Sequence, residues 1–275
     1  MTRCAVIGAG AWGTALADLL ARNGHETRIW AYEWDVVESI NRSHLNRRFL
    51  AGHPLFDTLT AYNGMEQALE DVELVTLAAP SHVLRAIVRS AAPFIRESAT
   101  IVVASKGIEP DTLALMTDIA SEELRGTTVV ALSGPSFASE VVAQQPTAVV
   151  VASRSEEAAL LAQQAFSSKH FRAYTHSDVT GVEIGGSLKN VMAVATGIAD
   201  GLGLGLGPVN PMNVPVMIVD PPFRIAIVDP TTTGGTTCPS SVRFLSRPSP
   251  PEMNIDPTLI LSTTTASCVP PARFT

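Results

Sequence analysis

Residues 4–17 read CAVIGAGAWGTALA, and this stretch decides the fold. Cys4–Gly8 predicts a strand because it is short and almost wholly apolar, and Trp12–Asn23 predicts a helix. Between them lies the pattern Gly-x-Gly-x-x-Gly, formed by Gly8, Gly10 and Gly13. This pattern is weak alone, but directly after a strand and at the start of a helix it indicates a site for the diphosphate of a dinucleotide.

Each glycine of the turn has a separate physical role. Gly8 permits the tight turn, Gly10 lets the backbone approach the diphosphate, and Gly13 lets the helix pack closely on the strand. The amides at the helix start, with the positive end of the helix dipole, hold the anion. The alternative is a glycine-rich turn without a ligand, which this context disfavours.

The first 205 residues alternate short apolar runs with longer amphipathic stretches. This rhythm predicts an α/β fold for residues 1–177, a Rossmann-like doubly wound domain with a mostly parallel sheet. Further strands are predicted at Thr27–Ala31, Glu73–Ala79, Thr100–Ala104, Thr127–Leu132, Ala148–Ala152 and Phe171–Tyr174. Further helices are predicted at Asp35–Arg42, Val83–Ser90, Thr112–Leu124, Glu156–Phe166 and Asp178–Gly201.

Residues 206–275 differ in composition from the rest of the chain. They hold 13 of the 19 prolines and no lysine. Each proline removes an amide donor and clashes with the preceding helical turn, and only Val214–Val219 and Phe223–Val228 resemble strands. We expect this Pro/Thr-rich segment to be largely disordered, because it cannot bury enough apolar surface to offset its conformational entropy.

Composition excludes several classes of protein. The net charge of −7 disfavours a nucleic-acid binder, which needs a basic face to displace counterions. The three cysteines, Cys4, Cys238 and Cys268, form neither a disulfide framework nor a zinc spacing, and the six histidines show no metal-ligand spacing. No apolar run is long enough for a membrane span, and the first strand leaves no room for a signal peptide. We therefore expect a cytoplasmic protein without a metal.

The end of the predicted strand Thr27–Ala31 should lie beside the adenine ribose of the dinucleotide. An acid about 20 residues after the glycines would select the ribose hydroxyl of NAD. Glu33 is near that place, but it could equally start the next helix, and Tyr32 and Arg28 are also near. This stretch leaves the choice between NAD and NADP open.

Three polar segments follow predicted strands, and ligands of open parallel sheets bind beyond such strand ends. They are Ala79–His82, Ser105–Gly107 and Ser133–Ala138. Lys106 could bind a phosphate or orient a substrate hydroxyl, or it could be a solvated lysine in a turn. Ser136 could help a helix start to bind an anion or the nicotinamide carboxamide, or it could be an N-cap. We assign His82 no catalytic role.

The long predicted helix carries Gly185, Lys189, Ala193 and Gly197 at four-residue steps, so they share one face. Packing of Lys189 among small residues would lower its pKa by desolvation and suit it to proton transfer. Spacing alone favours a solvated lysine.

Taken together, these segments resemble bacterial-type NAD(P)-dependent glycerol-3-phosphate dehydrogenase. The resemblance covers about residues 1–205. The segments that carry it are GAGAWGTALA at 8–17, SKG at 105–107, SGPSFASE at 133–140 and GVEIGGSLKNVMAVATGIADGLGLG at 181–205.

The resemblance implies hydride transfer between a nicotinamide and C2 of a three-carbon phosphate. It interconverts dihydroxyacetone phosphate and sn-glycerol 3-phosphate, which feeds glycerophospholipid synthesis. The resemblance makes Lys189 the proton acceptor and implies substrate contacts from Lys106, Gly134, Ser136 and Lys189. It implies cofactor contacts, with NAD or NADP, from Gly8, Gly10, Ala11, Trp12, Gly13, Tyr32, Lys106 and Ala138. The family usually has a basic residue at the position of Tyr32, so the preference for NADP stays open.

The sequence departs from the family after Gly205. Members continue with an all-helical domain, of which residues 178–205 would be the first helix, and it supplies an aspartate and a Ser-Arg-Asn segment that do not occur here. An abrupt departure inside a structural unit favours a shifted reading frame over an evolved tail. We expect the apolar face of Asp178–Gly201 to be exposed and the chain to aggregate. A homodimer, which the resemblance makes possible, is doubtful here because the probable interface is missing. The alternatives are a non-catalytic dinucleotide-binding remnant and a related hydroxyacid or sugar-nucleotide dehydrogenase.

Overall fold

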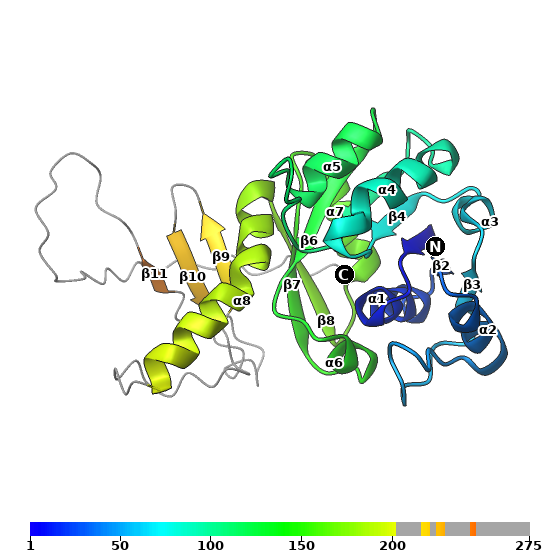
Figure 1. Ribbon diagram of the computed structural model, residues 1–275, viewed down its shortest axis with the longest axis horizontal. Helices are drawn as coiled ribbons and strands as arrows, with labels where there is room; N and C mark the ends of the chain where they lie inside the picture. Colours follow the sequence, from blue (N-terminus) through cyan, green and yellow to red (C-terminus); the bar gives the residue numbers. More distant parts are fainter. Residues whose placement is uncertain (202–215, 221–223, 229–242, 246–275) are drawn as a thin grey trace, which may run out of the picture. The chain divides into compact units, whose positions relative to one another are not determined.

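The computed structural model describes residues 1–201, 216–220, 224–228 and 243–245 (Figure 1). The chain forms two compact units, Met1–Ser187 and Leu188–Thr275. The first unit reaches beyond residue 177, where we predicted the dinucleotide-binding domain to end. The start of the long helix α8 (Val179–Gly201) therefore belongs to the first unit.

The first unit is built on one eight-stranded sheet with the order β3-β2-β1-β4-β5-β6-β7-β8. All neighbouring strands are parallel except β6 and β7, so the predicted mostly parallel, doubly wound sheet is confirmed. The strands are β1 Arg3–Ile7, β2 Glu26–Trp30, β3 Thr60–Tyr62, β4 Leu74–Leu77, β5 Thr100–Val103, β6 Thr128–Ser133, β7 Thr147–Ala152 and β8 Phe171–His176.

Helices cover both faces of this sheet (Figure 1). On one side lie α1 (Ala11–Arg22), α2 (Trp34–Ser43), α6 (Ala138–Val142) and α7 (Glu156–Phe166). On the other lie α3 (Met65–Leu69), α4 (Ser81–Ala91) and α5 (Met116–Glu123), with the short 3-10 helix η1 (Ala92–Phe94) after α4.

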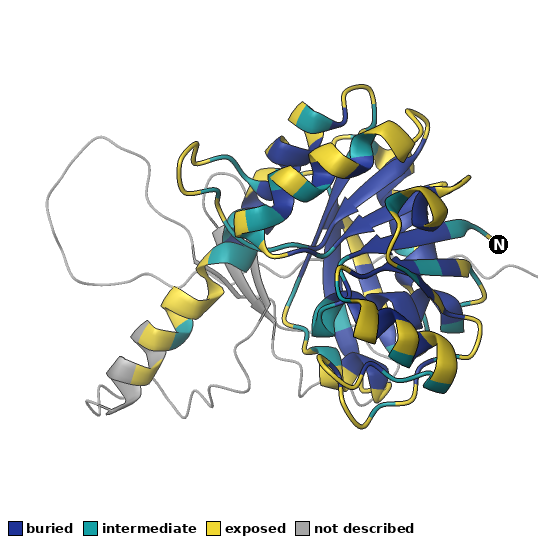
Figure 2. Ribbon diagram, turned by 45° about the vertical axis from the view of Figure 1, so that its right-hand side comes forward, coloured by how far each residue is buried: buried dark blue, intermediate teal, exposed yellow. Residues whose placement is uncertain are grey.

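Alternation along β1 explains the two layers. Cys4 and Val6 belong to the apolar cluster under α1, whereas Ala5 and Ile7 belong to the cluster under α4. Successive side chains of a strand point to opposite faces, so a strand that is apolar throughout must be covered on both. Figure 2 shows the result, with buried strands between helices that are exposed only on their outer sides.

The helix predicted at Thr112–Leu124 begins four residues later than expected, at Met116, so its predicted start was wrong. Leu113 has a φ of 60°, in the left-handed region, and its amide bonds to the carbonyl of Glu109 at 2.9 Å. The chain therefore turns back on itself before the helix starts. The short elements β3, α3 and η1 were not predicted, because none is long enough to establish a period.

The second unit includes the C-terminal part of α8 and a small antiparallel sheet with the order β11-β10-β9. The two segments that resemble strands, Val214–Val219 and Phe223–Val228, contain β9 (Val216–Asp220) and β10 (Arg224–Val228), within a tail that we expected to be largely disordered; β11 (Arg243–Leu245) was not expected. The expectation of disorder for 206–275 otherwise concerns residues outside the described ones. Within the described ranges, no helix has the length and apolar character needed to span a membrane.

Exposed apolar side chains mark α8 beyond Ser187, as the sequence predicted. They are Leu188, Val191, Met192 and Val194, of which Val191 and Val194 are more than 60% exposed.

Candidate functional site

The glycine turn between β1 and α1 has the geometry that its sequence predicts. Gly8 has a φ of +112°, and a Cβ there would lie 2.9 Å from the carbonyl oxygen of Ala78. A Cβ on Gly13 would overlap the carbonyl oxygen of Gly8, so α1 packs directly on the turn. A Cβ on Gly10 would meet no atom within 4 Å. The first and third glycines are therefore required by packing, and the second borders open space.

The start of α1 fits the diphosphate of a dinucleotide. Gly10 is its N-cap, no side chain caps the first turn, and no acidic residue lies there. The first amides of a helix lack partners within the helix, and here no carboxylate competes for them. An anion in the open space beside Gly10 would meet these amides and the positive end of the helix dipole.

Asn46 holds the glycine turn by hydrogen bonds, and the sequence analysis did not identify it. Its side chain is fully buried, and its Nδ2 donates to the carbonyl of Ala9 and to Oγ1 of Thr14, each at 2.8 Å. Its Oδ1 accepts from the amide of Phe49 at 3.0 Å. Asn46 lies in a segment where no element was predicted, and its role depends on a contact across 37 positions of sequence.

The structure shows where the three residues near the predicted ribose position, Arg28, Tyr32 and Glu33, lie at the end of β2. The side chain of Arg28 points toward α3. Its Nη1 donates to the carbonyls of Gln67 and Glu70 at 3.0 Å, and its Nη2 pairs with Glu26 at 2.9 Å. Tyr32 follows the strand and is 79% exposed. Glu33 is the N-cap position of α2, although its side chain makes no cap bond.

Lys106 is held at the centre of the candidate site, beyond the end of β5. Its Nζ donates to the carbonyl of Gly134 at 2.9 Å and lies 6.0 Å from the centre of the Trp12 ring. A Cβ on Gly186 would be 3.8 Å from Cδ of Lys106 and would overlap Oγ of Ser133. Four segments that are far apart in the sequence therefore meet around this lysine.

The loop after β6 brings the other predicted residues to the same place. A Cβ on Gly134 would lie 2.8 Å from the carbonyl oxygen of Ala148 on β7, so the close pairing of the two strands requires a glycine. Ser136 is not the N-cap of α6, a position that Phe137 takes; its Oγ donates to the carbonyl of Gly134 at 3.4 Å. Ala138 packs against the same apolar cluster as Ala11 and Trp12.

Glu183 is a second residue that sequence analysis missed. It is 8% exposed on α8, and it accepts hydrogen bonds from the amide and the hydroxyl of Thr117 in the first turn of α5. Burial raises the pKa of its carboxyl, although the bonds from Thr117 oppose this shift. Leu115, the N-cap of α5, has no polar side chain, so Glu183 supplies the missing acceptor from another helix.

The other residues singled out in the sequence differ in how far they are buried. Lys189 and Gly197 are exposed on the part of α8 in the second unit, whereas Gly185, on the same face one turn earlier, is buried in the first. His82 is exposed in the first turn of α4. Cys4 is a buried free thiol whose pKa burial raises to about 12. In the described part of the chain, no group of three or more His, Cys, Asp or Glu side chains could hold a metal ion.

Comparisons with known proteins identify the family. The model of the NAD-dependent glycerol-3-phosphate dehydrogenase N-terminus matches residues 3–159, and the model of the C-terminus of the same family matches residues 178–209. The chain belongs to the NAD-dependent glycerol-3-phosphate dehydrogenase family.

Relatives within this family cover a consistent part of the chain. A glycerol-3-phosphate dehydrogenase [NAD(P)+] from Citrifermentans bemidjiense is 47% identical over 206 residues, and one from Bacillus thuringiensis is 45% identical over 208 residues. Each match covers 74% of this chain and 62% or 61% of the relative. The chain thus spans less than two thirds of the length of these dehydrogenases.

Solved structures agree with this assignment. A glycerol-3-phosphate dehydrogenase from Coxiella burnetii is similar with a TM-score of 0.68 and 37% identity, over 74% of this chain and 63% of that chain. A UDP-glucose dehydrogenase from Pyrobaculum islandicum is similar with a TM-score of 0.58 and 18% identity, covering 74% of this chain and 52% of its own. The second likeness shows a shared fold alone.

Proposed function

We propose that this chain is the dinucleotide-binding part of an oxidoreductase that interconverts sn-glycerol 3-phosphate and dihydroxyacetone phosphate with NAD or NADP. The convergence of Lys106 on Trp12 and Gly134, beside the open start of α1, carries this proposal. It places a cation next to the turn that suits a diphosphate. The product would feed glycerophospholipid synthesis in a reducing, cytoplasmic compartment, where an unpaired thiol such as Cys4 persists.

The residues of this chain would divide the work of binding. Gly8, Gly10 and Gly13, with the amides of the first turn of α1, would hold the diphosphate. Trp12, with Ala11 and Ala138 packed on the same cluster, would form the apolar wall beside it. Tyr32, exposed after β2, would border the adenine ribose. Backbone amides would bind the anion directly, and the ammonium of Lys106 would add a cation beside them.

When bound, the nicotinamide supplies or accepts the hydride at C2 of the substrate. Lys106 would orient the substrate oxygens with its ammonium, and Ser136 and the loop at Gly134 would contact the same molecule. Lys189 would accept the proton of the C2 hydroxyl in the oxidative direction and return it in the reductive direction.

A second function is a dinucleotide-binding chain without turnover. The exposed apolar residues of α8 favour it, because this helix carries Lys189 and an exposed helix does not exclude water from a substrate.

One pair of measurements separates the two functions. Oxidation of NADH or NADPH upon addition of dihydroxyacetone phosphate, lost in Lys189→Ala, supports the enzyme. Binding of the dinucleotide without oxidation supports the second function. Absence of any affinity for NAD(H) or NADP(H) refutes both. Turnover of a hydroxyacid or a sugar nucleotide, but not of the three-carbon phosphate, would instead indicate a different dehydrogenase on the same fold.

Lys106→Ala tests the central residue. We expect it to weaken dinucleotide binding by about 10- to 150-fold, since a charged hydrogen-bond donor typically contributes about 1.5–3 kcal/mol. Lys169→Ala, which removes an exposed lysine between β7 and β8, is the matched control and should leave binding unchanged.

A further inference from the structure

The loop that carries Lys106 is anchored on both sides of the lysine. On the strand side, Oγ of Ser105 donates to the carbonyl of Ala79 at 2.6 Å. On the other side, Gly107 has a φ of +146°, and a Cβ there would be 2.8 Å from Cβ and Oγ of Ser81. Oγ of Ser187 also donates to the carbonyl of Gly107 at 3.3 Å. The backbone position of Lys106 therefore also depends on the contacts made by the residues that follow it in the loop.

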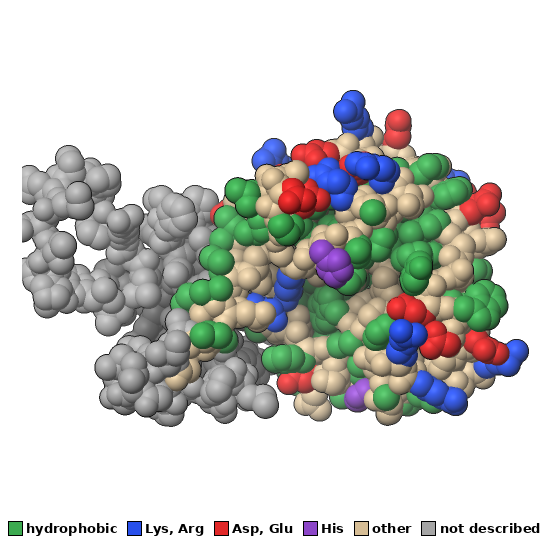
Figure 3. Space-filling view, in the orientation of Figure 1, with side chains coloured by type: hydrophobic (Ala, Val, Ile, Leu, Met, Phe, Trp, Pro, Cys, Tyr) green, Lys and Arg blue, Asp and Glu red, His purple; other side chains and the backbone are tan. Residues whose placement is uncertain are grey.

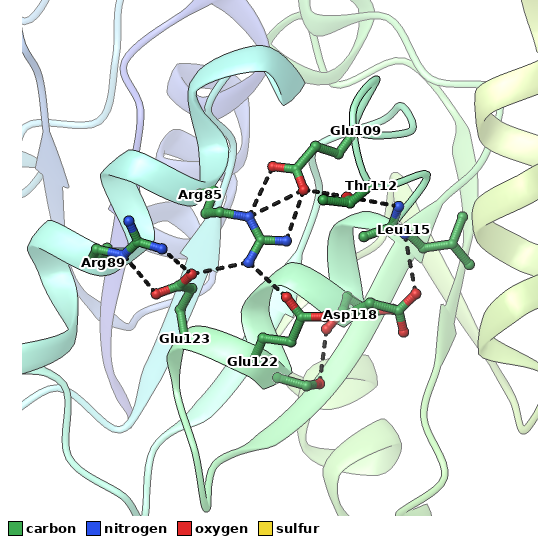
Figure 4. Close-up of polar contacts among 11 residues, drawn as sticks. Arg85, Arg89, Glu109, Thr112, Leu115, Asp118, Glu122 and Glu123 are labelled. Atoms are coloured by element: carbon green, nitrogen blue, oxygen red, sulfur yellow. Dashed lines mark hydrogen bonds and ion pairs between the residues drawn. The ribbon is translucent and has the colours of Figure 1, made fainter.

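The next anchor is an ion pair between Glu109 and Arg85 of α4 (Figure 4). Nε and Nη2 of Arg85 donate to the two carboxylate oxygens of Glu109 at 2.9 and 2.8 Å. The side chains of Arg85 and Glu109 are only 23% and 16% exposed. Such a bidentate contact fixes the orientation of the two side chains as well as their distance, which a lysine in place of Arg85 would not do.

Arg85 also reaches α5, so it joins three segments. Its Nη1 donates to Glu122 at 2.6 Å and to Glu123 at 3.0 Å. Arg89, one turn later on α4, binds Glu123 and, in the described part of the chain, no residue of the Lys106 loop. We call Arg85, Arg89, Glu109, Glu122 and Glu123 the Arg85 cluster; Figure 3 shows acidic and basic side chains interspersed over α4 and α5.

The ion pair between Arg85 and Glu109 stays charged under ordinary assay conditions. Hydrogen bonds from Arg85, and then from Thr112, lower the pKa of Glu109 to about 2 from its usual 4.5. Without Arg85, three carboxylates would face one another with Arg89 as their remaining basic partner among the described residues, and their repulsion would push Glu109 away from α4. Because Glu109 is three residues from Lys106, the loop would carry the lysine with it.

We propose that Arg85 is a positioning residue that holds Lys106, through Glu109, against Gly134 and Trp12. The consequence for binding rests on the function proposed above for Lys106; the consequence for its position does not. A shift of the order of 1 Å in a positioned group can cost up to about a hundredfold in activity, so small loop movements matter.

The test uses the full chain with Arg85→Ala and Arg85→Lys, and with Arg89→Ala as the matched control on the same helix. The first measurement is the rate at which an amine-acylating reagent modifies Lys106, followed by mass spectrometry without any ligand. Release of its ammonium from Gly134 should speed this reaction in both Arg85 variants and not in Arg89→Ala. The second measurement is the Kd for NADH and NADPH, which we expect to rise roughly tenfold in Arg85→Ala.

Equal acylation of Lys106 in wild type, Arg85→Ala and Arg89→Ala would overturn the proposal. An equal increase in the acylation rate of Lys106 in Arg85→Ala and in Arg89→Ala would also overturn it, since this would indicate that either substitution loosens α4 as a whole. If Arg85→Ala does not fold, Glu109→Gln replaces it, because it removes the charge of the same pair and keeps the shape. If wild type binds no dinucleotide, the proposed function fails, while acylation still decides the position of Lys106.

Discussion

Replacing Gly10 by alanine should separate cofactor binding from stability. A Cβ at this position meets no protein atom within 4 Å, and the backbone angles of Gly10, φ −64° and ψ 176°, suit alanine. Only the N-cap preference is lost, at a cost of about 0.5–1 kcal/mol. The melting temperature should therefore fall by only about 1–4 °C.

The effect on the dinucleotide should be larger. The added methyl group enters the space where a diphosphate would approach the amides of α1. Loss of one charge-assisted hydrogen bond costs about 1.5–3 kcal/mol, which corresponds to about a 10- to 150-fold rise in Kd. Gly13→Ala should behave in the opposite way, because its Cβ would overlap the carbonyl oxygen of Gly8. Overpacking costs about 1–3 kcal/mol and should lower the melting temperature by about 2–12 °C.

Calorimetric titration with NADH and NADPH, alongside thermal melts of the same samples, measures both quantities. The reasoning is refuted if Gly10→Ala binds the dinucleotide as tightly as wild type does. It is refuted equally if Gly10→Ala melts as low as Gly13→Ala, since the space beside Gly10 would then be needed for folding and not for a ligand.

Three further predictions concern packed or hydrogen-bonded side chains. Phe166→Ala removes a fully buried ring from the core under α7 and should lower the free energy of unfolding by about 3–5 kcal/mol in urea titrations; a loss below about 1 kcal/mol would contradict the packing. Asn46→Asp replaces a donor by a carboxylate facing the carbonyl of Ala9, so both stability and dinucleotide affinity should fall, while unchanged melts and affinity would show that the contact is dispensable. His25 accepts from the amide of Thr2 at Nδ1, and burial lowers its pKa from 6.5. The unfolded chain thus takes up a proton first, so stability should fall as the pH drops below 6.5, and the difference in melting temperature between wild type and His25→Gln should vary between about pH 5 and pH 8; a constant difference would exclude this linkage.

Local signals in the sequence were sufficient for most of the first unit. The glycine turn, the strand Thr100–Ala104 and the helix Glu156–Phe166 lie where they were predicted, because periodicity and turn chemistry act over a few residues. The start of α5 was misplaced because Leu113 has a positive φ. Its surroundings impose this backbone conformation, and the pattern of apolar residues does not reveal it. The antiparallel pairing of β7 with β6 could not be predicted from local sequence either, since an apolar strand has the same pattern in a parallel and in an antiparallel pair.

The candidate site shows the same division. Lys106, Gly134 and Ser136 were chosen from the sequence because parallel strands end at one edge of a sheet, and the structure brings Lys106 and Ser136 to the same carbonyl. Arg28 was near the ribose in sequence, but its side chain is committed to α3.

The sequence alone determined the class of fold and the place of the glycine turn, because a strand, three spaced glycines and a helix specify them through contacts between near neighbours. Only the tertiary structure decided that Asn46 holds that turn, that Glu183 caps α5, and that Arg85 holds Glu109. Each of these contacts joins residues more than 20 positions apart. Which polar side chains become partners then depends on how the helices pack, and neither spacing nor composition records that packing.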